Sequence, residues 1–363
     1  CIRDRDNTSN SIENNTNVFT FANGIIETPF YHVELNEAGH MTSLVDKKAD
    51  RQVLAKGAKA NVIQMFEDKP LAHEAWDIDI YYQEKMREVT DLTRMEVTEK
   101  GPLHMVVRLE WNYMNTKIKQ DMTFYVEDKR IDFKTWVDFR ERKQLMKVAF
   151  PVDIRSTYAT YDVQYGNVQR PTHWNTSWDW ARFETVAHKW VDLSERNYGV
   201  SLMNDCKYGH DIKNNVIRLT LLKSATHPDT EQDQGEHEFT YSLLPHEGSW
   251  VDADTEIRAY YLNNPLKVEA GKAKEDAYSF LNIDNKYIEV DAVKRSEDGK
   301  TLVIRCHEYT GGKQKATITL DAKVKGWQES NLMEKPEGDH FTSETITLEF
   351  GPYEVKTLSL IHI

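Results

Sequence analysis

Cysteine is scarce in this chain: its 363 residues include only Cys1, Cys206 and Cys306, and no two are spaced as C-x-x-C. Thiols so few and so far apart argue against a disulfide framework and favour a reducing cytoplasm. Long apolar runs are missing too, since none approaches the ~18 residues of a membrane-spanning helix. No basic segment followed by an apolar one resembles a signal peptide. We therefore predict a cytoplasmic protein with no membrane partner.

Positive charge is in deficit, because 46 Lys and Arg residues face 59 Asp and Glu residues, which gives a formal net charge of −13. Binding to nucleic acid requires a basic surface that neutralises phosphates, so this composition argues against a nucleic-acid partner. The composition leaves open whether the chain forms a homo-oligomer.

Long helical periodicity is almost absent, whereas alternation of apolar and polar residues is clear. Val107, Leu109 and Trp111 fall on one face of an extended segment, and the same alternation covers residues 131–139. Side chains of a strand point alternately to its two faces, so this pattern is typical of half-buried antiparallel strands. Repeated strands without intervening helices predict an all-β fold built from antiparallel sandwiches.

Composition divides the chain into three parts. Residues 1–16 are polar and rich in Asn, which predicts a disordered lead-in or linker. Residues 17–265 are predicted to form a large β domain, and residues 266–363 a smaller β sandwich that follows a charged linker. Further strands are predicted over 19–26 (with a hairpin turn at Asn23-Gly24), 31–35, 41–45, 62–66, 148–152, 200–204, 216–222, 238–244, 256–262, 280–283, 288–293, 302–307, 316–320 and 345–350.

Aromatic residues are concentrated in one stretch, residues 170–209, which holds four of the nine tryptophans: Trp174, Trp178, Trp180 and Trp190. Arg, Asn, Asp and His side chains are interleaved with them. Flat aromatic faces beside hydrogen-bonding groups are typical of a loop that faces a sugar or a protein partner. Large aromatics also serve packing, so an alternative is that they cap one end of a sandwich core.

Five segments in order carry a resemblance to a known family: FEDKPLAHEAWDIDIYY (66–82), RIDFKTWVDF (130–139), RPTHWNTSWDWARFE (170–184), HKWVDLSERNYGVSLMNDCKYGHDI (188–212) and HPDTEQDQGEHEFTYSLLPHEG (227–248). The chain resembles the C-terminal β domains of family 38 glycoside hydrolases, the α-mannosidases of the bacterial and cytosolic type. The resemblance covers about residues 18 to 363. It implies a galactose-mutarotase-like β-supersandwich followed by a smaller β sandwich.

The resemblance also implies what surrounds this chain. A retaining α-mannosidase of the family uses a nucleophilic Asp, a second carboxylic acid, and a zinc ion held by His and Asp in an N-terminal α/β domain. Nothing here matches the family's His-x-Asp ligand motif, so no nucleophile and no metal ligand is transferred to this chain. The chain begins at Cys1 rather than Met. We therefore expect a fragment that lacks zinc of its own, has the N-terminal catalytic domain of the same polypeptide as partner, and helps it act on a mannose-containing oligosaccharide.

Two acidic groups are candidates for a calcium site and for an acid–base pair. Asp229, Glu231 and Asp233 precede Gly235, but the spacing departs from an EF-hand loop, which favours an acidic surface turn. Asp77 and Asp79 would share a face if they lay on a strand, and paired carboxylates can exchange protons. A solvated loop near the junction with the catalytic domain is the favoured interpretation of this pair.

Loops of the β domain lend groups to the rim of the sugar pocket in this family, which identifies candidate contacts here. The predicted substrate-binding residues are Asn175, Trp178, Asp179, Arg182, Lys223 and Asp229. Many relatives carry Arg where this chain has Lys223, and Lys cannot form the same two-pronged hydrogen bond.

Three hypotheses for the function remain open. In the first, residues 174–182 form a surface that the catalytic domain covers, because interface cores favour Trp, Tyr and Arg. In the second, the chain is a stand-alone aldose-1-epimerase-like enzyme, in which Glu184 would pair with His173 or His188 as base and acid. In the third, which the tryptophan stretch suggests, it is a non-enzymatic carbohydrate-binding or scaffolding module. Exposure of Trp174, Trp178 and Trp180 discriminates an interface from a mutarotase-like closed pocket and from a simple sandwich core.

Overall fold

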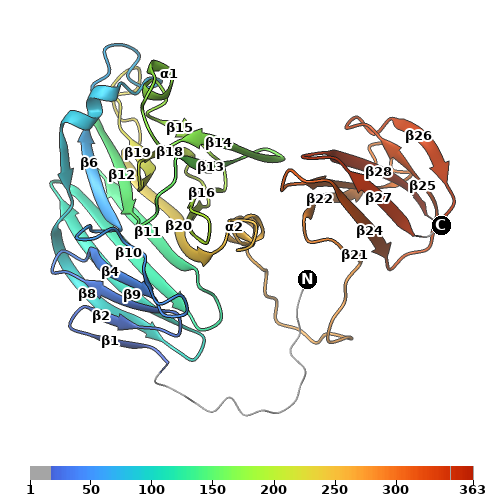
Figure 1. The fold of residues 1–363 in the computed structure, drawn as a ribbon, viewed down its shortest axis with the longest axis horizontal. Coiled ribbons are helices and arrows are strands. Elements are labelled where there is room, and N and C mark those ends of the chain that lie inside the picture. Colours follow the sequence, from blue (N-terminus) through green and yellow to red (C-terminus); the bar gives the residue numbers. More distant parts are fainter. Residues whose placement is uncertain (1–17, 344, 363) are drawn as a thin grey trace. The chain divides into compact units, whose positions relative to one another are not determined.

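The computed structural model describes residues 18–343 and 345–362, and the predicted lead-in at 1–16 lies outside these residues. The described chain divides into two compact units. The large unit comprises residues 18–162 and 168–266, and the small unit comprises residues 163–167 together with 267–343 and 345–362. Strands make up 52% and helices 5% of the described residues, and Figure 1 shows the strands gathered into sheets. The predicted all-β fold, a large sandwich followed by a smaller one, is confirmed.

Antiparallel sheets build the large unit. A five-stranded sheet among the described residues runs in the order β1 (Thr20–Ala22), β2 (Ile25–Glu27), β3 (Tyr31–Leu35), β4 (Met41–Asp46) and β5 (Arg51–Gln52). The longest sheet that the described residues form runs in the order β14 (Gly166–Pro171), β13 (Tyr158–Val163), β16 (Trp190–Ser194), β17 (Tyr198–Asn204), β20 (Gly235–Glu247), β11 (Ile131–Phe139), β10 (Thr116–Tyr125), β9 (His104–Tyr113) and β8 (Asp91–Lys100). The sheet that positions the candidate site runs in the order β15 (Thr185–Val186), β18 (Gly209–Lys213), β19 (Val216–Lys223), β12 (Gln144–Pro151), β6 (Val62–Glu67) and β7 (Met86–Glu88).

One continuous core joins the three sheets of the large unit. At its centre Phe133 of β11 stacks on Tyr241 of β20, with ring centroids 5.0 Å apart, and Phe150 of β12 lies 5.8 Å from Phe133. The hydroxyl of Tyr241 donates to Asn61 and accepts from Gln120, each at 2.7 Å. The buried polar atoms of this cluster are therefore paired, as a low-dielectric interior requires.

The alternation seen in the sequence corresponds to the inner faces of β9 and β11. On β9, Val107 and Leu109 are fully buried and Trp111 is nearly so. On β11, Ile131 and Phe133 are fully buried too. The predicted Asn23-Gly24 turn joins β1 to β2, and both residues have the positive φ that such a two-residue turn needs.

The small unit packs a second core of its own. One described sheet runs in the order β21 (Leu281–Ile283), β24 (Gln314–Leu320) and β27 (Ile346–Phe350). The other runs in the order β22 (Ile288–Arg295), β23 (Leu302–Glu308), β28 (Val355–His362), β25 (Val324–Ser330) and β26 (Pro336–Phe341). Ile304, Ile318 and Leu358 are fully buried between these sheets. The hairpin residues 163–167 belong to this unit as well, and Tyr165 packs against His307 with ring centroids 5.1 Å apart.

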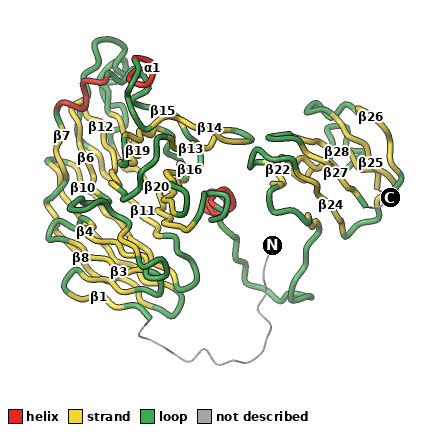
Figure 2. The backbone as a smooth tube through the Cα atoms, in the orientation of Figure 1, coloured by secondary structure: helices red, strands yellow, loops and turns green. Residues whose placement is uncertain are grey.

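Helices are few in the described residues: η1 (Ile80–Glu84), α1 (Ser177–Trp180) and α2 (Thr255–Asn263) (Figure 2). The strand predicted over 256–262 is wrong, because this segment forms α2. Ala259 and Leu262 lie on one helical face and pack beside Trp190, and the buried Glu256 accepts a hydrogen bond from the Trp190 ring nitrogen at 2.5 Å. These long-range contacts decide the local structure. No helix among the described residues has the length and apolar character to cross a membrane.

Candidate functional site

Three loops gather at one end of the sheet that contains β12, and we call them together the loop end: residues 68–85, 172–184 and 224–234. The first contains η1 and the second contains α1 (Figure 1). They meet where Tyr82 lies between Phe66 and Phe183, with ring centroids 5.1 and 6.3 Å away. A small aromatic core therefore fixes the first two loops against the sheet.

A buried layer of charge lies beneath these loops. Lys147 of β12 is fully buried, and its ammonium binds Glu184 and, at 2.7 Å, Asp211. Asp211 also binds Arg218 at 2.9 Å, and Glu184 accepts a hydrogen bond from the Thr220 hydroxyl at 2.5 Å. Burial alone would lower the pKa of Lys147, but the two carboxylates raise it above its ordinary value, so the lysine stays charged.

Glycine gives the Glu184 carboxylate its room. A Cβ at Gly209 on β18 would lie 2.9 Å from Glu184 Oε1 and 3.0 Å from the Thr220 Cβ. Glu184 is the only member of this layer, among the described residues, that belongs to a loop; the others lie on strands. We call the second loop, residues 172–184, the tryptophan loop. The charge layer therefore holds the end of the tryptophan loop in one position.

The tryptophan loop is shaped by a capping box. Thr176 is the N-cap of α1: its hydroxyl accepts from the Asp179 N–H at 3.2 Å, and the Asp179 carboxylate accepts from the Thr176 N–H at 3.2 Å. His173 Nδ1 lies 3.7 Å from the same carboxylate. Asp179, a predicted sugar contact, thus has a structural role that turns the next residues outward.

Large apolar side chains project from this end. Trp178 is 75% exposed and Trp180 50% exposed, and Trp76 in the first loop is 70% exposed. Trp174 is half-buried, with the Lys213 ammonium 3.4 Å from its ring centroid. The alternative in which the indoles of residues 170–209 fill the core is therefore wrong for Trp178 and Trp180. It holds for Trp190 of β16, which is buried.

The remaining predicted contacts are divided between exposed and internal positions. Asn175 and Arg182 are exposed, and their side chains have no hydrogen-bond partner within the described ranges. Lys223 instead binds the buried Asp68, which ties β19 to the first loop. Burial raises the pKa of Asp68, and the bond to Lys223 opposes that rise. Asp229 is exposed and accepts from the Glu231 N–H at 2.9 Å, forming a turn.

Glu74 connects the first and third loops. Its carboxylate binds Lys143 at 2.8 Å and accepts from the hydroxyl and the N–H of Thr226 at 2.9 and 3.1 Å. The hydrogen bond from Lys143, followed by those from Thr226, lowers the pKa of Glu74 to about 2. The sequence offered no sign of this residue's role, because its partners lie 69 and 152 positions away.

The acid–base pair expected beside the exposed aromatics is not formed within residues 18–343 and 345–362. Both oxygens of Glu184 are occupied by Lys147 and Thr220, so the proposed pairing of Glu184 with His173 or His188 does not form. Asp79 lies at the start of η1, not on a strand, and accepts from the Leu71 N–H at 2.7 Å. In the part of the chain that the structure describes, no three His, Cys, Asp or Glu side chains are grouped to hold a metal ion.

The fold and its loop end define a two-unit all-β region with an exposed aromatic surface. Residues 26–231 match the family described as glycosyl hydrolases family 38 C-terminal domain, and residues 287–358 match the glycosyl hydrolases family 38 C-terminal beta sandwich domain. The chain belongs to this family, as the C-terminal region of a family 38 glycosyl hydrolase.

Relatives of this chain are considerably longer. It is 36% identical over 352 residues to alpha-mannosidase 2C1 of Homo sapiens, covering 94% of this chain and 33% of that protein. It is 35% identical over 353 residues to alpha-mannosidase G of Dictyostelium discoideum, covering 93% and 32%. The chain spans about a third of the length of these relatives. A solved α-mannosidase from Enterococcus faecalis V583 shares the fold, with a TM-score of 0.76 and 17% identity over 94% of this chain and 42% of that one.

Proposed function

We propose that this chain is the non-catalytic C-terminal part of a zinc-dependent retaining α-mannosidase, and that it supports a catalytic domain that precedes it in the same polypeptide. The observation that carries the proposal is the match to α-mannosidases over only a third of their length. The lack of a metal group among the described residues is consistent with zinc being held by the preceding domain.

The loop end is the surface proposed to contact that domain. Trp178 and Trp180 lie on α1, whose start is fixed by the capping box and whose loop ends at the buried charge layer, and Trp76 in the first loop is exposed as well. Exposed clusters of large aromatics are uncommon on surfaces that remain in water. Trp together with Arg182 matches the composition of well-packed interface cores.

Contacts with the mannose-containing oligosaccharide are proposed for the same end. Asn175, Trp178 and Arg182 offer a free amide, an aromatic face and a guanidinium, which are groups that orient sugars. Asp179 and Lys223 would act indirectly, through α1 and through Asp68. Asp229 lies in the third loop and is proposed as a further rim contact.

The decisive test is enzymatic. The 363-residue chain, purified free of other glycosidases, should release no nitrophenol from an aryl α-mannoside, with or without added zinc. The parent polypeptide that includes the preceding region should release it and should lose this activity to a chelator. Zinc-dependent release by the chain alone would overturn the non-catalytic assignment.

The cytoplasm is the proposed compartment. Cys206 and Cys306, the cysteines within the described ranges, are both free thiols, as a reducing environment favours.

A further inference from the structure

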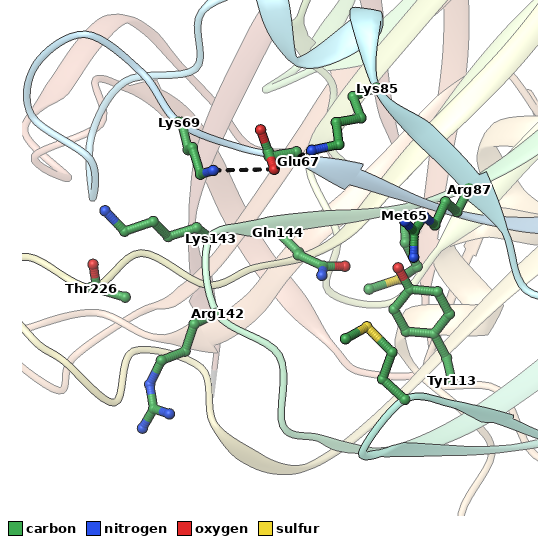
Figure 3. A pocket seen from close by; sticks show the side chains of 11 residues that line it. Met65, Glu67, Lys69, Lys85, Arg87, Tyr113, Arg142, Lys143, Gln144 and Thr226 are labelled. Atoms are coloured by element: carbon green, nitrogen blue, oxygen red, sulfur yellow. Dashed lines mark hydrogen bonds and ion pairs between the residues drawn. The ribbon is translucent and has the colours of Figure 1, made fainter.

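A groove of about 390 Å³ lies beside the loop end, between β6, β7 and the turns after β9 and β11 (Figure 3). Cationic side chains from separate segments line it. These are Lys69, Lys85, Arg87, Arg142 and Lys143. Such a concentration of positive charge contrasts with the chain as a whole, whose net charge is −13.

The groove keeps positive charge that its own carboxylates do not balance. Lys69 and Lys85 share the single carboxylate of Glu67, at 3.1 and 2.8 Å. Arg142 and Lys143 each have a carboxylate partner, in Glu231 and Glu74 respectively. Arg87 has none within residues 18–343 and 345–362, and it lies beside the Tyr113 ring in Figure 3. One charge of the shared lysine pair and the charge of Arg87 therefore remain available to an anion.

Polar and apolar groups complete the groove. Gln144 projects between Lys143 on one side and Arg87 on the other (Figure 3). Its side-chain amide already bonds the Tyr113 hydroxyl, while its buried Oε1 atom has no partner of its own among the described residues. A buried acceptor without a donor is costly, and a ligand hydroxyl would satisfy it. Met65 and Tyr113 supply an apolar wall on the same side.

We propose that this groove binds a small sugar phosphate. The guanidinium of Arg87 donates two hydrogen bonds to the phosphate, and the Lys85 ammonium adds charge beside it. The Gln144 carbonyl accepts a hydrogen bond from a sugar hydroxyl, and Met65 and Tyr113 contact the C–H face of the ring. Pockets for small ligands measure about 300–1,000 Å³, so the groove suits one phosphorylated monosaccharide. The phosphate and hydroxyl contacts rest only on the lining of the groove, and the choice of mannose as the test sugar rests on the proposed function.

Calorimetric titration of the 363-residue chain tests the proposal. Mannose 6-phosphate should bind saturably, more tightly than inorganic phosphate, and mannose without phosphate should not bind at the groove. Affinity should fall as salt is added, because the contacts are charged and near the surface. Absence of saturable binding overturns the proposal. Equal affinity for inorganic phosphate overturns its sugar component, and tighter binding of an acidic peptide than of the sugar phosphate overturns the ligand class.

Matched variants place the binding in the groove. Arg87→Gln should lower the affinity for mannose 6-phosphate by about tenfold. Arg196 is an exposed arginine outside the groove, and Arg196→Gln should change this affinity by less than about twofold. Gln144→Met should lower the affinity for mannose 6-phosphate and leave the affinity for inorganic phosphate unchanged. Equal affinities for the Arg87 and Arg196 variants would overturn the assignment. Arg87 lies on an exposed part of the short edge strand β7, so its replacement preserves folding, which thermal melting checks.

Discussion

Lys147 shows how one side chain can determine the position of a distant loop. It contacts Glu184 and Asp211, which are 37 and 64 positions away, and all three are largely shielded from water. No local pattern in the sequence indicates that a lysine in an apolar strand will be buried with two carboxylates. Such groups are invisible to periodicity because only the assembled sheet brings them together.

Removing the lysine should be severe. Lys147→Met would leave Glu184 buried without its charged partner and Asp211 with Arg218 alone, so the free energy of unfolding should fall by about 3–5 kcal/mol. Urea denaturation measures the loss, and Lys117→Met, at an exposed lysine of β10, is the control. The double variant Lys147→Met, Glu184→Gln should recover part of the loss. A loss below about 1 kcal/mol would show that the pair is solvated.

Leu109 tests the inner face of β9. Its side chain is fully buried in the core, so Leu109→Ala should destabilise the large unit by about 2–5 kcal/mol through lost contacts and a residual cavity. Asn112→Ala, at an exposed position of the same strand, should change stability by less than about 0.5 kcal/mol. An unchanged urea midpoint for the leucine variant would contradict the register.

His210 makes stability depend on pH. Burial lowers its pKa from 6.5 to about 4, so the unfolded chain binds this proton more readily than the folded one between those values. Stability should therefore fall as pH drops from 6.5 to 4, by roughly 3 kcal/mol in total. His40, whose pKa burial also lowers, adds to the same window. Glu74, with a pKa lowered to about 2, contributes stability that is lost only below about pH 4.5.

Urea midpoints at pH 7 and pH 5 measure the effect of His210. His210→Gln removes the titrating group and should reduce the difference between the two midpoints without abolishing it, because His40 remains. His237→Gln, at a partly exposed histidine of β20, is the control and should leave the difference unchanged. An equal difference in the wild type and the His210 variant would mean that His210 is solvated in the folded chain.

At the scale of elements, the strands that could be predicted are those with a strong local pattern. β3 agrees with its predicted range at both ends, and β9 and β11 agree with their alternating faces. Strand β10 was not predicted although its side chains alternate between buried and more exposed positions; β8 and β26 were missed because β8 is half exposed along its length and β26 is exposed throughout. Edge strands of this kind bury too little apolar surface to leave an alternating pattern.

The strand predicted over 256–262 was wrong for the opposite reason. Its residues Ala259, Tyr260 and Tyr261 resemble a strand, but the helical face that packs beside Trp190 appears only once β16 is in place. The tryptophan loop lies between these cases. Its capping box can be recognised from Thr176 and Asp179, three positions apart, whereas the outward direction of Trp178 depends on Glu184 being fixed by Lys147.

At the scale of the whole molecule, the sequence predicted two β sandwiches and a family, and it located the aromatic surface. It did not predict the internal partners of the site, because Lys223 with Asp68 and Glu74 with Lys143 are pairs that span more than 60 positions. Candidate contacts chosen by position therefore include both outward groups, such as Arg182, and groups that hold the loops together.

The exposed indoles should make the isolated chain associate with itself. Trp76, Trp178 and Trp180 place apolar surface in water at one end of the large unit, and burying it against a second copy removes that surface from solvent. Sedimentation velocity over increasing concentration should show a reversible rise in mean mass. The double variant Trp178→Ser, Trp180→Ser should shift this rise to at least about tenfold higher concentration, whereas Tyr158→Ser, at an exposed aromatic outside the loop end, should not.

The separately produced preceding region of the parent polypeptide should suppress association by covering the same side chains. Association that the tryptophan variant leaves intact would assign the contact to another surface, and a chain that stays monomeric at every concentration would show that the loop end tolerates water.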